Sequence, residues 1–133
     1  MELYVYSAAV SVAACVLLMA LAFRAGMSRM SGDGVKVLET YTTKNEKFII
    51  ANRIHLNTLE NVVVFLPLLW IATLYGSPVI AASIGGVWLF ARITFAIMYT
   101  KDPSKRAPAF ITSFFCHVAL VLLSVYGLVM MFV

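Results

Sequence analysis

Hydrophobic residues gather into four long blocks along the chain, separated by short polar segments. Each block approaches or exceeds the roughly 20 residues that a helix needs to cross a hydrocarbon core of about 30 Å. The blocks are Leu3–Phe23, Phe48–Leu74, Pro78–Met98 and Ala107–Val133. The pattern therefore predicts an all-α, integral membrane four-helix bundle that forms a single domain over residues 1–133, with helices at about 3–29, 46–75, 78–100 and 106–132.

Polar residues and prolines mark the ends of these helices. Asn45 and Glu46 suit the start of the second helix, and Ser77-Pro78 opens the third after a tight turn, so helices two and three are expected to be antiparallel neighbours. Asp102-Pro103-Ser104 cannot continue the third helix. Because no basic residue precedes the first block, we expect a membrane helix there and not a cleaved signal peptide.

The charges add a direction to this bundle. The chain is 62% hydrophobic and 12% charged, with a mean hydropathy of +0.95, whereas soluble proteins carry roughly a quarter charged residues. By the positive-inside rule, the first and third connections are expected to face the cytoplasm and both termini the other side. The ten basic residues all belong to those two connections: Arg24, Arg29, Lys36, Lys44, Lys47 and Arg53 to the first, and Arg92, Lys101, Lys105 and Arg106 to the last.

The net charge of +4 therefore reports membrane topology. Aromatic residues are not interleaved with the basic ones, so the pattern does not indicate nucleic-acid binding. Cys15 and Cys116 lie inside apolar helices, where a cysteine behaves as a small hydrophobe, and they form neither a disulfide framework nor a metal-ligand spacing. A bacterial inner membrane and an endoplasmic reticulum fit the composition equally well.

A polar run at the start of the second apolar block is energetically anomalous. Ionised groups at membrane depth cost several kcal/mol each, so they persist where they face a bundle interior, pair with one another or bind something. At about 100° per residue, Arg53, Asn57 and Glu60 fall within an arc of roughly 60° on one helical face. This stripe is the first half of a candidate site.

The third helix offers a matching stripe of Arg92, Phe95 and Tyr99. Because this helix runs back toward the cytoplasm, Arg92 is expected about 10 Å inside Tyr99, at a depth that overlaps the first stripe. Guanidinium groups bind carboxylates, a carboxylate binds an ammonium, and a cation such as Arg106 near a sulfur lowers the thiol pKa. The predicted ligand is therefore small and zwitterionic, for example a peptide-like thiol with two carboxylates and one amine.

Less functional interpretations of the same residues remain open at this point. Glu60 with Arg53 or with Arg92 would form buried ion pairs that merely fix the helix register. Glu60 alone would couple protons to substrate in a small multidrug-type transporter. His55 points away from the stripe and His117 stands alone in the last helix, so both are interpreted as structural.

Two of these motifs resemble those of a known family. The segment from Arg53 to Asn61 resembles the R-x-x-x-N-x-x-E signature of the second helix in the MAPEG family, the membrane-associated proteins in eicosanoid and glutathione metabolism. The segment from Val87 to Arg92, with Phe95 and Tyr99, is similar to the family's motif in the third helix. The four-helix plan and the cytoplasmic connections match as well, so the resemblance covers essentially the whole chain.

The resemblance implies a homotrimer that binds glutathione between adjacent subunits near the cytoplasmic face. The implied glutathione-binding residues are Arg29, Arg53, Asn57, Glu60, Arg92 and Tyr99. Arg106, seven residues after Tyr99, is similar in spacing to the thiol-activating arginine of leukotriene C synthases and is the implied catalytic residue. Phe110 and Ile111 stand where prostaglandin E synthases carry a catalytic arginine and serine, which disfavours prostaglandin synthesis.

These observations lead to the expectation of a multi-pass membrane glutathione transferase whose active site faces the cytoplasm. Glutathione would be the co-substrate, and a lipophilic electrophile or a lipid hydroperoxide would arrive from the bilayer. The family also contains a non-catalytic lipid-binding member. A protein that only binds lipid or glutathione is therefore the main alternative, ahead of a proton-coupled transporter.

Overall fold

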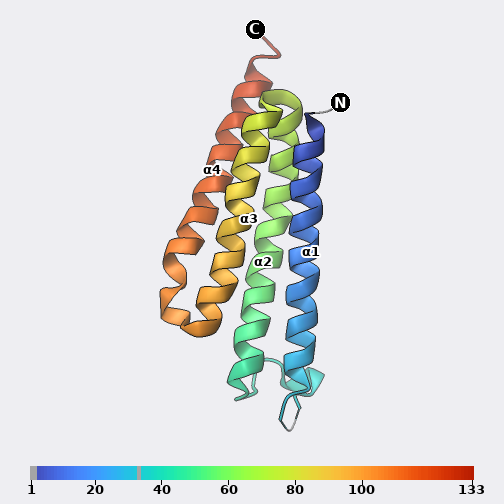
Figure 1. Ribbon diagram of the computed structural model, residues 1–133, viewed down its shortest axis with the longest axis vertical. Coiled ribbons are helices and arrows are strands. Elements are labelled where there is room, and N and C mark those ends of the chain that lie inside the picture. The colour runs from blue at the N-terminus through green and yellow to red at the C-terminus, as the bar shows by residue number, and fades with distance from the viewer. Residues whose placement is uncertain (1–2, 33) are drawn as a thin grey trace.

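The computed structural model describes residues 3–32 and 34–133, and in this part of the chain four long helices form an elongated bundle (Figure 1). All four are long and apolar enough to cross a membrane, which confirms the predicted all-helical membrane architecture. The elements, in chain order, are α1 (Tyr4–Arg29), the short 3-10 helix η1 (Val37–Glu39), α2 (Glu46–Ile71), the π-helical turn η2 (Ala72–Gly76), α3 (Pro78–Lys101), the 3-10 helix η3 (Pro103–Arg106) and α4 (Ala107–Val129).

Local side-chain chemistry explains where the helices begin. The side chain of Asn45 accepts a hydrogen bond from the backbone N–H of Phe48 at 3.1 Å, which satisfies one of the free donors at the start of α2. Ser77 precedes α3 in extended conformation, and Pro78 takes the first helical position, where its missing N–H costs nothing. Helix α2 continues through Pro67, and its last predicted turn is the π-helical η2.

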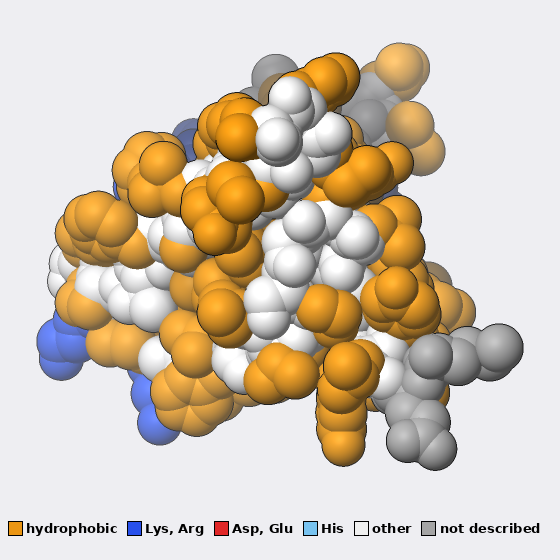
Figure 2. All heavy atoms as spheres, turned by 90° about the horizontal axis from the view of Figure 1, so that it is seen from above, with side chains coloured by type: hydrophobic (Ala, Val, Ile, Leu, Met, Phe, Trp, Pro, Cys, Tyr) orange, Lys and Arg blue, Asp and Glu red, His pale blue; other side chains and the backbone are white. Residues whose placement is uncertain are grey.

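The connections put both termini at one end of the bundle, beside the turn between α2 and α3 (Figure 1). The α1–α2 and α3–α4 connections lie at the opposite end. Seen from the terminal end, the surface of the described residues consists mainly of hydrophobic side chains, and basic side chains show only at its margins (Figure 2). This arrangement has the charge asymmetry that the sequence predicts. Which end faces the cytoplasm remains a prediction.

The interior of the bundle half near the termini is tightly packed. Phe65 and Trp88 stack with ring centroids 3.8 Å apart and planes within 5°, at the centre of the larger hydrophobic cluster. A Cβ atom on Gly127 of α4 would overlap the Tyr75 carbonyl of η2, so only glycine allows α4 to approach the turn this closely. A buried hydrogen bond of 2.8 Å joins the hydroxyls of Ser7 and Thr73 across α1 and η2.

Candidate functional site

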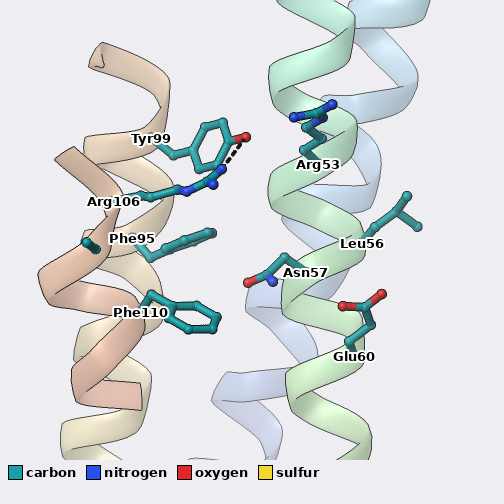
Figure 3. Close-up of a pocket in the computed structure, with 9 residues that line it drawn as sticks. Arg53, Leu56, Asn57, Glu60, Phe95, Tyr99, Arg106 and Phe110 are labelled. Atoms are coloured by element: carbon teal, nitrogen blue, oxygen red, sulfur yellow. Dashed lines mark hydrogen bonds between the residues drawn. The ribbon is translucent and has the colours of Figure 1, made fainter. Parts of the chain in front are cut away.

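A cavity of about 410 Å³ opens between α2 and the facing ends of α3 and α4, toward the end of the bundle that carries the α1–α2 and α3–α4 connections (Figure 3). Tyr99, Arg106, Phe95 and Phe110 form one wall, and α2 forms the other. The lining residues are Arg53, Leu56, Asn57, Glu60, Phe95, Tyr99, Arg106, Ala107 and Phe110. The structure thus brings five predicted site residues, from three helices, to one cavity.

The wall formed by α2 arises from a simple division of the helix into two faces. Its buried residues, which recur every three or four positions, form a stripe against the rest of the bundle: Phe48, Ala51, Ile54, Thr58, Val62, Phe65 and Leu69. Arg53, Asn57 and Glu60 lie beside that stripe and line the cavity. Asn57 is half-buried, whereas Arg53 and Glu60 are exposed on the isolated chain. The polar stripe that the helical spacing predicts is therefore present.

The opposite wall carries Tyr99 and Arg106 in direct contact. Nη1 of Arg106 donates a hydrogen bond of 3.0 Å to the Tyr99 hydroxyl, and Cζ of Arg106 lies 5.2 Å from the centroid of the tyrosine ring. Tyr99 is almost fully buried, while Arg106 is exposed to the cavity. Because the phenol accepts from Arg106, its own O–H remains available to donate to a ligand.

The short turn between α3 and α4 holds Arg106 in this place. Oδ1 of Asp102 accepts hydrogen bonds from the backbone N–H and the hydroxyl of Ser104, at 3.0 and 2.7 Å, and thereby caps η3. These bonds to Ser104 lower the pKa of the Asp102 carboxyl from its ordinary value, and Lys105 adds an ion pair at 3.7 Å. The capped turn ends at Arg106, directly beside the last full turn of α3.

Arg92 lies next to the cavity and does not line it. Its side chain is fully buried, and Nη2 donates hydrogen bonds of 2.8 Å to Oδ1 of Asn57 and to Oγ1 of Thr58. Cζ of Arg92 also lies 4.2 Å from the centroid of the Phe95 ring. Nε and Nη1 have no hydrogen-bond partner within residues 3–32 and 34–133. The predicted meeting of the two polar stripes therefore occurs through Arg92 and Asn57.

The bond from Arg92 sets the direction of the Asn57 amide. An asparagine side chain has an acceptor oxygen and a donor NH₂ group, and their assignment follows from the hydrogen-bond network. Since Oδ1 accepts from Arg92, the NH₂ group is the half that remains for the cavity. The cavity wall thus offers donors from Arg53, Asn57, Tyr99 and Arg106, and the carboxylate of Glu60 as the contrasting acceptor.

The ion pairs considered from the sequence are absent. Within the described part of the chain, the salt bridge that forms is between Lys105 and Asp102, and Glu60 pairs with neither Arg53 nor Arg92. The interpretation of Glu60 as half of a register-fixing ion pair within the chain is therefore wrong. The charged groups on the cavity wall are instead left open to a bound ligand or to another subunit.

Arg29 lies outside the cavity of its own chain. It ends α1, donates a hydrogen bond of 3.2 Å to the hydroxyl of Thr40, and places Cζ 4.8 Å from the Phe48 ring centroid. These contacts tie the α1–α2 connection to the start of α2. The structure thus does not bring Arg29 together with the other predicted glutathione-binding residues in one chain.

Sequence reasoning missed several residues at this site. Leu56, Ala107 and Phe110 line the cavity but carry only apolar groups, so no polar pattern singles them out. Thr58 holds Arg92, and its signal was a hydroxyl within the otherwise apolar buried stripe of α2. His117 packs against Phe65 and Trp88, with ring centroids 6.4 and 6.3 Å away, a position consistent with its structural interpretation.

The fold and the site define a class: a four-span helical membrane protein with an arginine-rich cavity near one end of the bundle. The MAPEG family model matches residues 7–126. The chain is also 36% identical over 105 residues to an uncharacterized protein of Synechocystis sp., an alignment that covers 79% of this chain and 74% of that protein. The chain therefore belongs to the MAPEG family, whose members include glutathione transferases and related membrane enzymes.

Proposed function

We propose that this protein is a membrane-bound glutathione transferase that conjugates glutathione to lipophilic electrophiles, with reduction of lipid hydroperoxides as a second activity. The observation that carries the proposal is the cavity in which Arg53, Asn57, Glu60, Tyr99 and Arg106 come together. Family membership supports a glutathione-related function on the membrane. The reaction itself is inferred from the chemistry of the cavity wall.

Glutathione has two carboxylates, one ammonium and one thiol, and the cavity offers a complement to each. The guanidinium of Arg53 and the NH₂ group of Asn57 suit carboxylate and carbonyl oxygens. The unpaired carboxylate of Glu60 suits the ammonium group. A ligand with this pattern would neutralise charges that are costly to leave open at membrane depth.

Arg106 is the residue proposed to activate the thiol. A cation beside a sulfur favours the thiolate, which is the nucleophilic form. The Tyr99 hydroxyl accepts a hydrogen bond from Nη1 of Arg106, so the guanidinium, which lines the cavity, is held in place before the ligand binds. Such a preorganised donor stabilises developing charge without reorganisation during the reaction.

The lipophilic substrate is proposed to enter from the bilayer at the apolar part of the cavity. Phe95, Ala107 and Phe110 provide this surface next to Arg106. In the transferase reaction the thiolate sulfur would attack an electrophilic carbon and displace its leaving group. In the peroxidase reaction two glutathione molecules would be oxidised to the disulfide while the hydroperoxide is reduced to an alcohol and water.

The exposure of Arg53 and Glu60 on a single chain supports the proposed homotrimer. Both residues are exposed although α2 is apolar on either side of the polar run, and charges that face lipid are expensive. A neighbouring copy that covers the open side of the cavity would remove this cost. Arg29, which lies at the same end of the bundle, is proposed to contact a glutathione carboxylate across that interface.

Purified oligomer in lipid nanodiscs tests the proposal. Glutathione should bind at a stoichiometry set by the subunits, and turnover should be seen with a chromogenic aryl halide or with a lipid hydroperoxide. Binding without turnover of either substrate would favour the non-enzymatic lipid- or glutathione-binding alternative. Absence of glutathione binding would refute the proposal, and proton-coupled uptake in liposomes would point to a transporter.

A further inference from the structure

Thr58 is the polar member of a buried, otherwise apolar stripe on α2, which includes Ile54 and Val62 one turn to either side. Its side chain is fully buried, and Oγ1 accepts a hydrogen bond of 2.8 Å from Nη2 of Arg92. A buried hydroxyl is costly unless it is hydrogen-bonded, so a threonine at this position calls for a specific partner. The partner is a guanidinium that also contacts the cavity wall.

Three other threonines in the membrane helices donate their hydroxyl hydrogen within their own helix. Thr73, Thr100 and Thr112 each donate to the backbone carbonyl four residues earlier, at 2.6, 2.6 and 2.9 Å. Such bonds satisfy the hydroxyl within its own helix. Thr73 and Thr100 add a contact between helices to that bond, with Ser7 and with Arg24 respectively. Among the described residues, the hydroxyl of Thr58 has only the contact between helices, and it accepts from Arg92, 34 positions away on α3. Thr58 thus makes a contact between helices, and the loss of its hydroxyl would change how Arg92 is held.

Arg92 links Thr58 to Asn57. A single nitrogen of Arg92, Nη2, has two N–H groups, and the structure assigns one to Thr58 and the other to Oδ1 of Asn57. Nε and Nη1 of Arg92 have no hydrogen-bond partner within the described residues. The two bonds from Nη2 to oxygen atoms on α2 are therefore the hydrogen bonds that hold this guanidinium. Without the Thr58 hydroxyl, the buried guanidinium of Arg92 would keep only the Asn57 oxygen as a hydrogen-bond acceptor. It could then move and break its bond to Asn57.

We propose that Thr58 and Arg92 form a buried clamp that turns the Asn57 NH₂ group toward the cavity, and that Thr58 is therefore a positioning residue for the ligand. The inference rests on the proposed binding of glutathione in the cavity. It also gives Arg92 a role that fits its full burial: it acts through Asn57 and need not touch the ligand. Neither role involves Arg106, which is held by Tyr99 on the opposite wall.

Four variants test the clamp. Thr58→Val removes the hydroxyl at nearly constant shape and should raise the Kd for glutathione by about five- to ten-fold, the size expected for weakening one ordinary hydrogen bond between Asn57 and the ligand. Thr58→Ser keeps the hydroxyl and should have a Kd within about two-fold of the wild-type value. Thr112→Val removes a hydroxyl that bonds only its own helix and should leave the Kd unchanged. If Thr58→Val does not fold, Thr58→Cys carries the same test, since sulfur is a weak acceptor.

A double-mutant cycle separates positioning from general structural support. If Thr58 acts through Asn57, Thr58→Val should change the Kd by less than about two-fold in an Asn57→Ala background. The thiolate fraction of bound glutathione should stay at the wild-type value in Thr58→Val, because Arg106 and Tyr99 are untouched. Independent effects of the two substitutions, or wild-type affinity in Thr58→Val, would overturn the proposal.

A ligand-free readout keeps this test distinct from the test of function. In protein labelled with ¹⁵N-asparagine, the side-chain NH₂ signal of Asn57 should shift in Thr58→Val and stay in place in Thr112→Val. An unchanged Asn57 signal would refute the clamp even if glutathione binds. A shifted signal in a protein that does not bind glutathione would support the clamp and refute the proposed function.

Discussion

Two pairs of polar side chains near the termini bond to each other, whereas Arg53 and Glu60 at the opposite end line a cavity without an ion-pair partner in the described part of the chain. In the first region the Ser7 and Thr73 hydroxyls pair, and Nε1 of Trp70 donates to the hydroxyl of Ser11 at 3.1 Å. In the second, Arg53 and Glu60 have no salt-bridge partner within residues 3–32 and 34–133. In the first region the polar groups satisfy one another and stabilise the bundle. In the second region the charged groups remain available to a ligand.

The difference also shows in how the helices approach each other. Near the termini, Gly127 lets α4 touch the turn between α2 and α3, and Phe65 stacks on Trp88. Near the other end, α2 is separated from the facing ends of α3 and α4 by the cavity (Figure 3). Substitutions in the half near the termini should therefore change stability, and substitutions in the half with the cavity should change binding and catalysis.

Removing the proposed activating cation should have the largest effect. Arg106→Ala is expected to lower kcat/KM by about 10²- to 10³-fold, as expected for the loss of one preorganised electrostatic group, while glutathione still binds. The measurement is turnover together with the ultraviolet absorbance of the bound thiolate. Lys101→Ala, which removes an exposed cation at the end of α3, is the matched control and should leave both unchanged. Unaltered thiolate absorbance in Arg106→Ala would remove Arg106 from the mechanism.

Adding a methyl group in the half near the termini should cost stability. Gly127→Ala would push a Cβ atom into the Tyr75 carbonyl and is expected to destabilise the protein by about 1–3 kcal/mol, measured as the midpoint of thermal unfolding in detergent. Gly26→Ala is the control, because a Cβ at Gly26 meets nothing within 4 Å. Equal unfolding midpoints for the two variants would show that the approach of α4 to the turn is not tight.

Neutralising the carboxylate of the cavity should weaken recognition of an ammonium group. Glu60→Gln is expected to raise the Kd for glutathione by about ten-fold, since it replaces a charge-assisted hydrogen bond by a neutral one. A glutathione analogue without the amine should bind wild type and Glu60→Gln equally, and isothermal titration compares the four combinations. An equal loss of affinity for both ligands would place the ammonium group elsewhere.

Breaking the hydroxyl pair in the half near the termini should have the smallest effect. Thr73→Val removes the 2.8 Å bond to Ser7 and is expected to lower the free energy of unfolding by about 1 kcal/mol. The Kd for glutathione should not change, because Thr73 lies in the turn at the far end of the bundle. Chemical unfolding and a binding isotherm on the same preparation check both statements, and a weakened affinity would contradict the separation of the two halves.

Much of this fold could be predicted because hydrophobic blocks and helix-breaking residues are local signals. The stripe of Arg53, Asn57 and Glu60 also followed from helical periodicity, since the face of a residue depends only on its spacing. The partner of each side chain did not follow, because it depends on how the helices pack. Counting residues along the helices predicted that Arg92 lies at the same membrane depth as the stripe on α2. Such counting could not show that Arg92 is buried and bonds to Asn57 and Thr58.

The remaining parts of the site lie beyond a single chain's sequence pattern. Phe110 carries no polar group, so only the packing of α4 reveals it as cavity lining. Arg29 contacts Thr40 and Phe48 in its own chain, and its proposed approach to glutathione requires a second subunit. For contacts between helices or subunits, the spacing of residues in the sequence identifies candidates. Only the packing of the helices shows which of them touch.

A structure of the oligomer with glutathione bound tests the central claim most directly. We predict a tripeptide in the cavity, between subunits, with its sulfur beside Arg106, its ammonium group at Glu60 and an oxygen at the Asn57 NH₂ group. Arg92 should remain beneath, bonded to Asn57 and Thr58. A cavity filled by lipid, or glutathione bound at a surface without Arg53 and Glu60, would contradict the account.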